Sequence, residues 1–390
     1  MQPILFIFSK AKVGKLGGSQ PLSVGLGCES LGVISHEIGH ALGFVHEQER
    51  PERDSYVRIN LQYAIPGTEG NFDKRPLGTT VDLGVPYDLG SVMHYASTVD
   101  ENHFIGANSL KAFTFESLRH TVDPIDTKYR STVGNRVAPS FTDIKQINRA
   151  YCADSCRNTI NICENEGYPD PNDCSRCKCP QGLGGATCTD LEYSSCGGEI
   201  QADYEWQSLN YSVSSTCYWR ISAYPGGHVR FKVTDVFFKC SPTCSEFIEI
   251  KYLADMQVTG FRLCCYPEGG VLVSHGPFIL LIVRAVAPSR FAIKYMSDGG
   301  IKPSDAQDVW SEWGEWSECS EMCGACGFKR RHRNCLEGTC KLYEEGYAGC
   351  RQLTNGVVSG SSLVTVDVIQ LGDLVVQFVM ITLAELNVSF

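Results

Sequence analysis

The sequence contains no long hydrophobic run and no excess of positive charge. The closest approach to a membrane span, LVVQFVMITLA near the C-terminus, is shorter than the ~20 apolar residues that such a span needs. The chain has 34 lysines and arginines against 44 acidic residues, which gives a net charge of −10. We therefore expect no membrane span and no nucleic-acid partner, because a nucleic-acid binder needs a dominant basic face.

Cysteine is nearly absent from the first 150 residues and abundant after them. Only Cys28, of the 20 cysteines, lies before residue 150. The later part of the chain is therefore expected to form small modules held by disulfides, which implies an oxidising, extracellular compartment. Two N-glycosylation triplets, which start at Asn210 and Asn387, fit a secreted glycoprotein.

The first residues, MQPILFIFSKAK, lack the features of a signal peptide. They have no charged n-region, and their apolar run of about six residues is shorter than the roughly 7–15 residues of a signal-peptide core. A secreted composition without such a signal leads us to expect that the true N-terminus is missing from this chain.

A helix is predicted for residues 31–45, where apolar side chains recur at helical spacing. These apolar residues are Leu31, Ile34, Ile38, Leu42 and Val45. The predicted helix overlaps the stretch HEIGHALGFVHEQERPERD, which begins at His36 and contains the pattern HExxHxxGxxH. HExxH alone has many false matches, and ordinary surface histidines would explain them. The extended pattern is far more specific, so it argues against that alternative.

The histidines of this pattern have the spacing of a catalytic zinc site. His36 and His40 lie four residues apart, so both rings leave one face of the helix and can share a metal ion. Gly43 is expected to end the helix with a positive φ, which lets His46 return as a third ligand. Three protein ligands leave one position on zinc for water, and Glu37 is placed to deprotonate that water as general base.

A second signal lies downstream in YDLGSVMHY, which supplies Met93 and Tyr95. A methionine-containing turn beneath the zinc ion is typical of metzincin proteases. With these residues the sequence resembles the astacin family of zinc endopeptidases over about residues 13–152. Four segments carry the resemblance: GGSQPLSVGLGC, HEIGHALGFVHEQERPERD, SVMHY and FTDIKQINRAYC.

The resemblance implies a multidomain protein that begins with an α+β metzincin protease domain. It implies one Zn²⁺ per chain, with His36, His40 and His46 as ligands and Glu37 as the base. It also implies that Tyr95 is an extra, displaceable ligand that swings away to donate a hydrogen bond to the transition-state oxyanion. Met93 would form the methionine turn of this domain, which spans residues 1–152.

The chain also departs from the family pattern. About the first third of the expected catalytic domain is absent, so we expect a domain that is incomplete at its N-terminus. Cys28 and Cys152 match one partner of each family disulfide, while the Ser9 region replaces the partner of Cys28. Each lost bridge would cost about 2–5 kcal/mol. The chain could be a partial version of a normal protease or a short form that binds zinc poorly.

Glu47 also matches the family pattern. It corresponds to the acidic residue that, in the family, helps to bind the new N-terminus of the mature enzyme.

Residues 153–190 hold six cysteines and end in CKCPQGLGGATC, which resembles the end of an EGF-like domain. Spacing alone allows fifteen pairings. An oxidising compartment favours disulfides over a zinc site for these cysteines. The resemblance implies the pairs Cys156–Cys174, Cys163–Cys177 and Cys179–Cys188.

Residues 196–297 contain short alternating segments such as TCYWRIS and EFIEIKY, with turn signals between them, which is typical of a β-sandwich. This region resembles a CUB domain, which implies a disulfide between Cys196 and Cys217. Glu246 matches a calcium-binding position of some CUB domains, but IVRAVAPSRFAIKY lacks the last acid, so no calcium is predicted. Scaffolding and substrate recognition stay open as roles. Two more bridges, with open connectivity, would use Cys240, Cys244, Cys264 and Cys265.

Residues 307–350 contain WSEWGEWSECSEMCGACGFKRRHRNC and resemble a thrombospondin type 1 repeat. In such a repeat, arginines stack between tryptophans, so at least half of the basic cluster is predicted to be structural rather than a heparin or nucleic-acid site. Trp310 and Trp313 also resemble C-mannosylation sites. The residues involved are Trp310, Trp313, Trp316, Arg330, Arg331 and Arg333, with Cys319, Cys323, Cys326, Cys335, Cys340 and Cys350 available for bridges. Residues 351–390 form an unassigned tail.

The order of these modules resembles a subgroup of nematode astacins. It implies a secreted zinc metalloendopeptidase that hydrolyses extracellular matrix or cuticle proteins, with matrix or glycan contacts through the CUB and thrombospondin modules. The alternative is a non-catalytic extracellular adhesion or binding protein that carries a protease remnant. The sequence does not name the substrate, the mode of latency or the oligomeric state.

Overall fold

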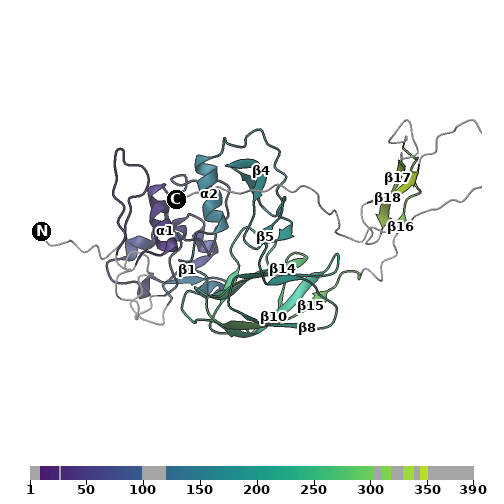
Figure 1. The fold of residues 1–390 in the computed structure, drawn as a ribbon. Coiled ribbons are helices and arrows are strands. Elements are labelled where there is room, and N and C mark those ends of the chain that lie inside the picture. The colour runs from purple at the N-terminus through teal and green to yellow at the C-terminus, as the bar shows by residue number, and fades with distance from the viewer. Residues whose placement is uncertain are drawn as a thin grey trace, which may run out of the picture. The chain divides into compact units, whose positions relative to one another are not determined.

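The computed structural model describes residues 9–25, 28–98, 120–302, 309–317, 328–337 and 343–349 (Figure 1). The chain divides into two compact units, one that ends at Ile301 and one that begins at Lys302. Within the described ranges, no helix has the length and apolar character needed to cross a membrane. The tail of residues 351–390 with Asn387, and five cysteines predicted for the last module, lie outside the described residues: Cys319, Cys323, Cys326, Cys340 and Cys350.

Two helices, α1 (Leu31–Ala41) and α2 (Phe141–Tyr151), are the main elements of the first domain (Figure 1). Ser30 begins α1, and its hydroxyl accepts a hydrogen bond from the Val33 N–H. Ser140 and Asp143 cap α2 reciprocally, because each side chain accepts the backbone N–H of the other residue. Strands β1 (Val57–Ile59) and β2 (Val122–Pro124) pair antiparallel. Short 3₁₀ turns cover Glu47–Glu49, Arg53–Ser55, Leu61–Tyr63, Glu69–Phe72 and Thr127–Ser131.

Helix α1 ends earlier than the predicted residue 45. Gly43 has φ +97°, and its N–H donates to the His40 carbonyl while the Phe44 N–H donates to the Gly39 carbonyl. This pair of bonds is a Schellman motif, which closes the helix and turns the chain away before Val45. The break at Gly43 was predicted, but Val45, the one periodic apolar residue beyond it, is not helical.

The buried face of α1 is not its apolar stripe. Leu31 and Ile38 are 63% and 45% exposed, whereas His36 and Glu37 are 0% and 2% exposed. The helix therefore turns its polar face into the domain. A helix that buries histidine and glutamate needs nearby polar partners, because an unpaired buried polar group is costly.

The cysteine-rich segment that follows is built on two small antiparallel sheets. Strands β3 (Tyr168–Asp170) and β4 (Asp173–Lys178) form one sheet, and β5 (Leu183–Gly184) and β6 (Asp190–Leu191) form the other. Its three disulfides are the pairs that the EGF resemblance implied: Cys156–Cys174, Cys163–Cys177 and Cys179–Cys188.

Residues 197–298 form a sandwich of two sheets, called the sandwich below (Figure 1). One sheet has the strand order β13-β10-β15-β8, and the other has the order β12-β11-β14-β9-β7, with β7 parallel to β9. The bounds are β7 Gly197–Gln201, β8 Gln207–Val213, β9 Cys217–Ser222, β10 His228–Phe237, β11 Phe247–Lys251, β12 Phe261–Leu263, β13 Leu272–Val273, β14 Phe278–Arg284 and β15 Ser289–Asp298.

The sandwich core consists of the side chains that alternate inward from both sheets, among them Trp219, Phe231, Ile248 and Leu281. Cys196 is bonded to Cys217, as the CUB resemblance implied. The connectivity left open by the sequence is Cys240–Cys265 and Cys244–Cys264. Cys28 and Cys152 take part in none of the six disulfides in the described residues.

Glu246, which was considered as a calcium ligand, serves the sandwich differently. Its carboxylate accepts the backbone N–H groups of Val286 and Ala287, at 2.9 and 3.2 Å. The side chain therefore holds the turn between β14 and β15.

The second unit contains a three-stranded antiparallel sheet of β16 (Val309–Trp310), β17 (Phe328–Glu337) and β18 (Tyr343–Gly349). The guanidinium of Arg331 lies 4.6 and 4.7 Å from the ring centres of Trp313 and Trp316, and that of Arg333 lies 4.8 Å from Trp313. Arg331 and Arg333 share one face of β17 because side chains alternate along a strand. Arg330 falls on the opposite face and is exposed.

Replacing Leu281 by alanine is expected to destabilise the sandwich by about 2–5 kcal/mol, because a fully buried side chain would leave a cavity. Urea denaturation of the full chain, followed by fluorescence and circular dichroism, measures this loss. Val286→Ala is the control, since that side chain is 74% exposed. Equal denaturation curves for the two variants would contradict the assigned core.

Candidate metal centre

The structure brings the three predicted histidines together. His36 and His40 come from α1, and His46 follows the Gly43 turn. One nitrogen of each ring lies within 4.8 Å of the others, and this is the one group of three or more potential metal-binding His, Cys, Asp or Glu residues found among the described residues. The Nε2 atoms of His40 and His46 are 3.2 Å apart.

The opposite nitrogen of each ring has a fixed partner. The Nδ1 atom of His36 lies 2.8 Å from the Val92 carbonyl, and that of His40 lies 2.8 Å from the Phe44 carbonyl. The Nδ1 atom of His46 lies 3.3 Å from the carboxylate of Glu49. Because carbonyls and carboxylates only accept hydrogen bonds, each neutral ring carries its proton on Nδ1 and directs a bare Nε2 inward.

This arrangement fits a tetrahedral metal ion such as zinc. The buried Nε2 of His36 has no hydrogen-bond partner among the described residues. The Nε2 atoms of His40 and His46 cannot bond to each other when both lack a proton, so their approach is repulsive without a cation. Two nitrogens that share one tetrahedral zinc lie about 3.3 Å apart, close to the observed spacing.

Burial keeps these rings neutral. It lowers the pKa of His40 to about 4 and lowers the pKa of His36 well below its usual value. It also lowers the pKa of His46, although hydrogen bonding to Glu49 opposes that shift. Neutral imidazole is the form that binds a metal, so the site is prepared for a ligand at neutral pH.

Glu37 lies beside the triad on the buried face of α1. Burial raises the pKa of its carboxyl, while the Ala11 N–H and the charge of Arg136 oppose that rise. A carboxylate with a raised pKa is a better proton acceptor at neutral pH than an exposed one.

Met93 and Tyr95 complete the predicted set. Both side chains are buried, and the rings of Tyr95 and His46 have their centres 4.4 Å apart. Burial raises the pKa of Tyr95, which keeps its phenol protonated and able to donate a hydrogen bond. A Cβ atom on Gly39 would lie 2.7 Å from the Met93 sulfur, so the methionine turn packs directly against α1.

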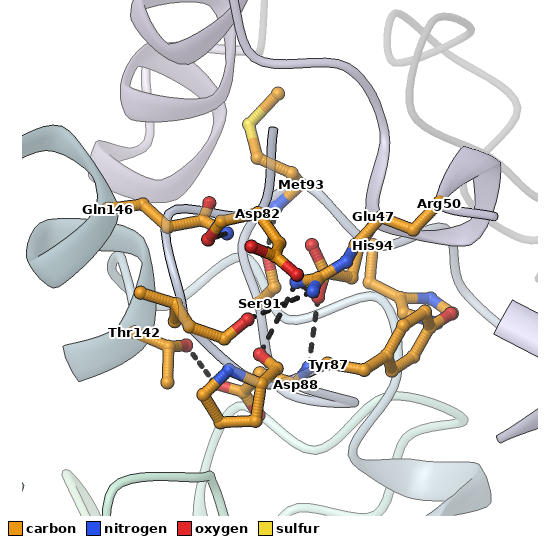
Figure 2. A network of polar contacts seen from close by, with 12 residues as sticks. Glu47, Arg50, Asp82, Tyr87, Asp88, Ser91, Met93, His94, Thr142 and Gln146 are labelled. Atoms are coloured by element: carbon orange, nitrogen blue, oxygen red, sulfur yellow. Dashed lines mark hydrogen bonds and ion pairs between the residues drawn. The ribbon is translucent and has the colours of Figure 1, made fainter. Parts of the chain in front are cut away.

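Buried hydrogen bonds hold the methionine turn and the side chain of Glu47 in place (Figure 2). Asp143 accepts hydrogen bonds from the Ser91 hydroxyl and from the Val92 N–H, at 2.6 and 2.8 Å. The Glu47 carboxylate accepts from Arg50 and from the Asp88 N–H, both at 2.9 Å. Burial raises the pKa of Glu47, while the positive charge of Arg50 opposes that rise. The N-terminus-binding role that the resemblance gave to Glu47 stays a prediction.

Sequence reasoning missed the residues that orient the metal ligands. Arg136 donates to the carbonyl of Val92, which is also the partner of His36, and to the carbonyl of His94. His94 is fully buried and binds the Tyr87 hydroxyl, so it is not one of the clustered histidines. The capping pattern Ser140 to Asp143 was a usable signal, but its role in the turn depends on tertiary contacts.

Comparisons with known proteins identify the family of this chain. Residues 6–152 match the Astacin family of peptidases. Zinc metalloproteinase nas-26 of Caenorhabditis elegans is 38% identical over 297 residues, which cover 73% of this chain and 68% of that protein. The chain belongs to the astacin family. Zinc is therefore its expected cofactor, with one ion at the three histidines.

Other relatives of this astacin-family chain are longer. Zinc metalloproteinase nas-30 of Caenorhabditis elegans is 40% identical over 309 residues, which cover 77% of this chain and 40% of that protein. The chain thus spans about 40% of the length of that relative.

A solved structure is also similar to this chain. It is High choriolytic enzyme 1, a hatching enzyme zinc-protease from Oryzias latipes, which is 39% identical in sequence. The match covers 37% of this chain and 64% of that chain, with a TM-score of 0.32.

Gly39→Ala tests the contact between α1 and the methionine turn. Alanine normally stabilises a helix relative to glycine by about 1 kcal/mol. Here the added methyl group would displace Met93, so we expect a net loss of about 1–3 kcal/mol and weaker zinc binding. Urea denaturation and competition with a chromophoric zinc chelator measure these effects.

Gly269→Ala is the matched control, because a Cβ atom there meets nothing within 4 Å. A Gly39→Ala protein as stable as this control, with unchanged zinc affinity, would refute the packing of Met93 against the helix.

Proposed function

We propose that this chain is a secreted zinc metalloendopeptidase that hydrolyses extracellular proteins of the matrix or cuticle type. The observation that carries the proposal is the convergence of three bare histidine nitrogens, with Glu37 buried beside them. Membership of the astacin family supports the same reaction class.

Each residue has a distinct proposed role. His36, His40 and His46 hold zinc, which when bound supplies Lewis acidity and lowers the pKa of water to roughly 7. Glu37 accepts the proton of the attacking water at its carboxylate and passes it to the departing amine. Tyr95 donates its phenol hydrogen to the oxygen that gains negative charge in the transition state.

The remaining domains are proposed to be accessory modules. We assign residues 153–190 as EGF-like, 196–297 as CUB and 307–350 as a thrombospondin type 1 repeat, after a protease domain in residues 1–152. The disulfides of the first two and the stacked Arg331 of the third support this assignment. Matrix or glycan contacts through these modules belong to the proposal.

Extracellular location is proposed on the same grounds. Six disulfides in the described residues fit an oxidising compartment. Asn210 lies exposed on β8, where a glycan could be attached.

Glu37→Gln is expected to lower kcat by about 10²–10⁴-fold while zinc content stays at one ion per chain, because the amide cannot accept the proton. Cleavage of a quenched peptide library and metal analysis of the full chain measure both quantities. Removing zinc with a chelator is expected to abolish wild-type cleavage, and added zinc is expected to restore it.

The control is Glu29→Gln, since Glu29 is exposed just before α1. Wild-type protein that binds zinc but cleaves nothing would contradict the enzyme and favour the non-catalytic binding protein instead.

Tyr95→Phe is expected to lower kcat by about 10²–10³-fold with little change in KM, because the lost donor acts on charge that develops in the transition state. Steady-state kinetics on a single peptide from the library measure the split. A change confined to KM would show that Tyr95 contributes to substrate binding and not to oxyanion stabilisation.

A further inference from the structure

The sandwich contacts the protease domain at a buried carboxylate, that of Asp88. This side chain is 1% exposed and accepts four hydrogen bonds. Two come from the protease domain, from the Gly90 N–H at 2.9 Å and the Thr142 hydroxyl at 2.6 Å. Two come from Thr259 of the sandwich, from its N–H at 3.1 Å and its hydroxyl at 3.0 Å. Half of the hydrogen bonds to this carboxylate therefore cross the domain boundary.

The contact is close and is not isolated. A Cβ atom on Gly90 would lie 2.3 Å from the Thr259 Cβ, so only glycine fits against this side chain. Buried Lys145 of α2 donates to the Gln257 side chain at 2.8 Å. Three further hydrogen bonds join the two domains: Arg262 N–H to the Thr132 hydroxyl, Cys244 N–H to the Ser131 carbonyl, and the Thr243 hydroxyl to the Val133 carbonyl.

Asp88 is connected to the proposed metal ligands through backbone hydrogen bonds and neighbouring residues. Its backbone N–H donates to Glu47, which directly follows His46 (Figure 2). Its carbonyl accepts the N–H of Ser91, and the Ser91 hydroxyl accepts the N–H of Met93. Val92, between those two residues, supplies the carbonyl that orients His36.

We propose that Thr259 of the sandwich is a positioning residue for the metal centre. It fixes the Asp88 carboxylate at the start of the methionine turn and thereby fixes the carbonyl that orients His36. The inference rests on the proposed zinc site and not on proteolysis. It makes the sandwich a structural part of the protease as well as a recognition module.

The first test uses the unaltered full chain. Coupling between two sites is reciprocal, so zinc must strengthen the Thr259 contact if that contact strengthens zinc binding. Hydrogen exchange measured by mass spectrometry, with and without zinc, is expected to slow about threefold or more in peptides that cover 255–262. Peptides that cover 240–246 contain the Cys244 N–H, which also crosses the boundary, and are expected to change less than twofold. Equal change in the two regions, or none in the first, would overturn the proposal.

The second test removes one hydroxyl. Thr259→Val is expected to weaken zinc binding roughly threefold to tenfold and to accelerate exchange in peptides that cover 88–95, because distant support of metal ligands tunes affinity. Thr259→Ser, which keeps the hydroxyl, is expected to restore both values. Thr243→Val is the matched control, since it removes a hydroxyl bond to the protease domain away from Asp88.

The outcomes separate this proposal from the proposed function. If the wild type binds no zinc, the proposed function fails, and the metal-free exchange in peptides 88–95 of Thr259→Val and Thr243→Val still decides the positioning role. If Thr259→Val and Thr243→Val behave alike in zinc affinity and exchange, Thr259 contributes only to docking and the proposal is wrong. If Thr259→Val does not fold, the exchange of the unaltered chain with and without zinc decides.

Discussion

Lone pairs on three imidazole nitrogens repel one another, and the protease domain must hold them a few ångströms apart before any metal arrives. Each ring is fixed by a hydrogen bond at its other nitrogen, to the carbonyls of Val92 and Phe44 and to the carboxylate of Glu49. Burial keeps the rings uncharged, so the repulsion is between dipoles and not between full charges. The rest of the domain can be understood as the means of holding these hydrogen-bond acceptors in place.

The supports of these acceptors are themselves buried and polar. The Val92 carbonyl lies in a turn whose Val92 N–H donates to Asp143 of α2. Arg136, in the segment that precedes α2, donates to the same carbonyl. A buried carboxylate is tolerated only where donors surround it, and Asp88 and Asp143 each have several. A metal site of this kind therefore depends on a connected network, in which removing one donor leaves another group without its partner.

The sequence was informative where function depends on local spacing. His36, Glu37 and His40 needed only the helix repeat, and the Gly43 turn followed from the rule for glycine at helix ends. The helix end at Ala41 and the buried polar face of α1 were missed, because apolar periodicity reports where a helix forms and not which face it buries. The roles of Arg136 and Asp88 were not predictable, since Val92 and Thr259, which they bind, are distant from them in sequence. Asp88 lies within the quoted stretch YDLGSVMHY, but that pattern does not reveal its contact with the sandwich.

Module boundaries read from the cysteine pattern suggest independent units, but the polar contacts between the protease domain and the sandwich argue for a single structural body up to Ile301. The interface combines apolar packing, in which Tyr129 joins the sandwich core beside Phe261, with hydrogen bonds at Asp88, Lys145 and Thr259. Such an interface is geometrically selective, because a shifted docking leaves buried donors and acceptors unsatisfied. The sandwich is thus positioned relative to the metal centre by the same chemistry that positions the metal ligands.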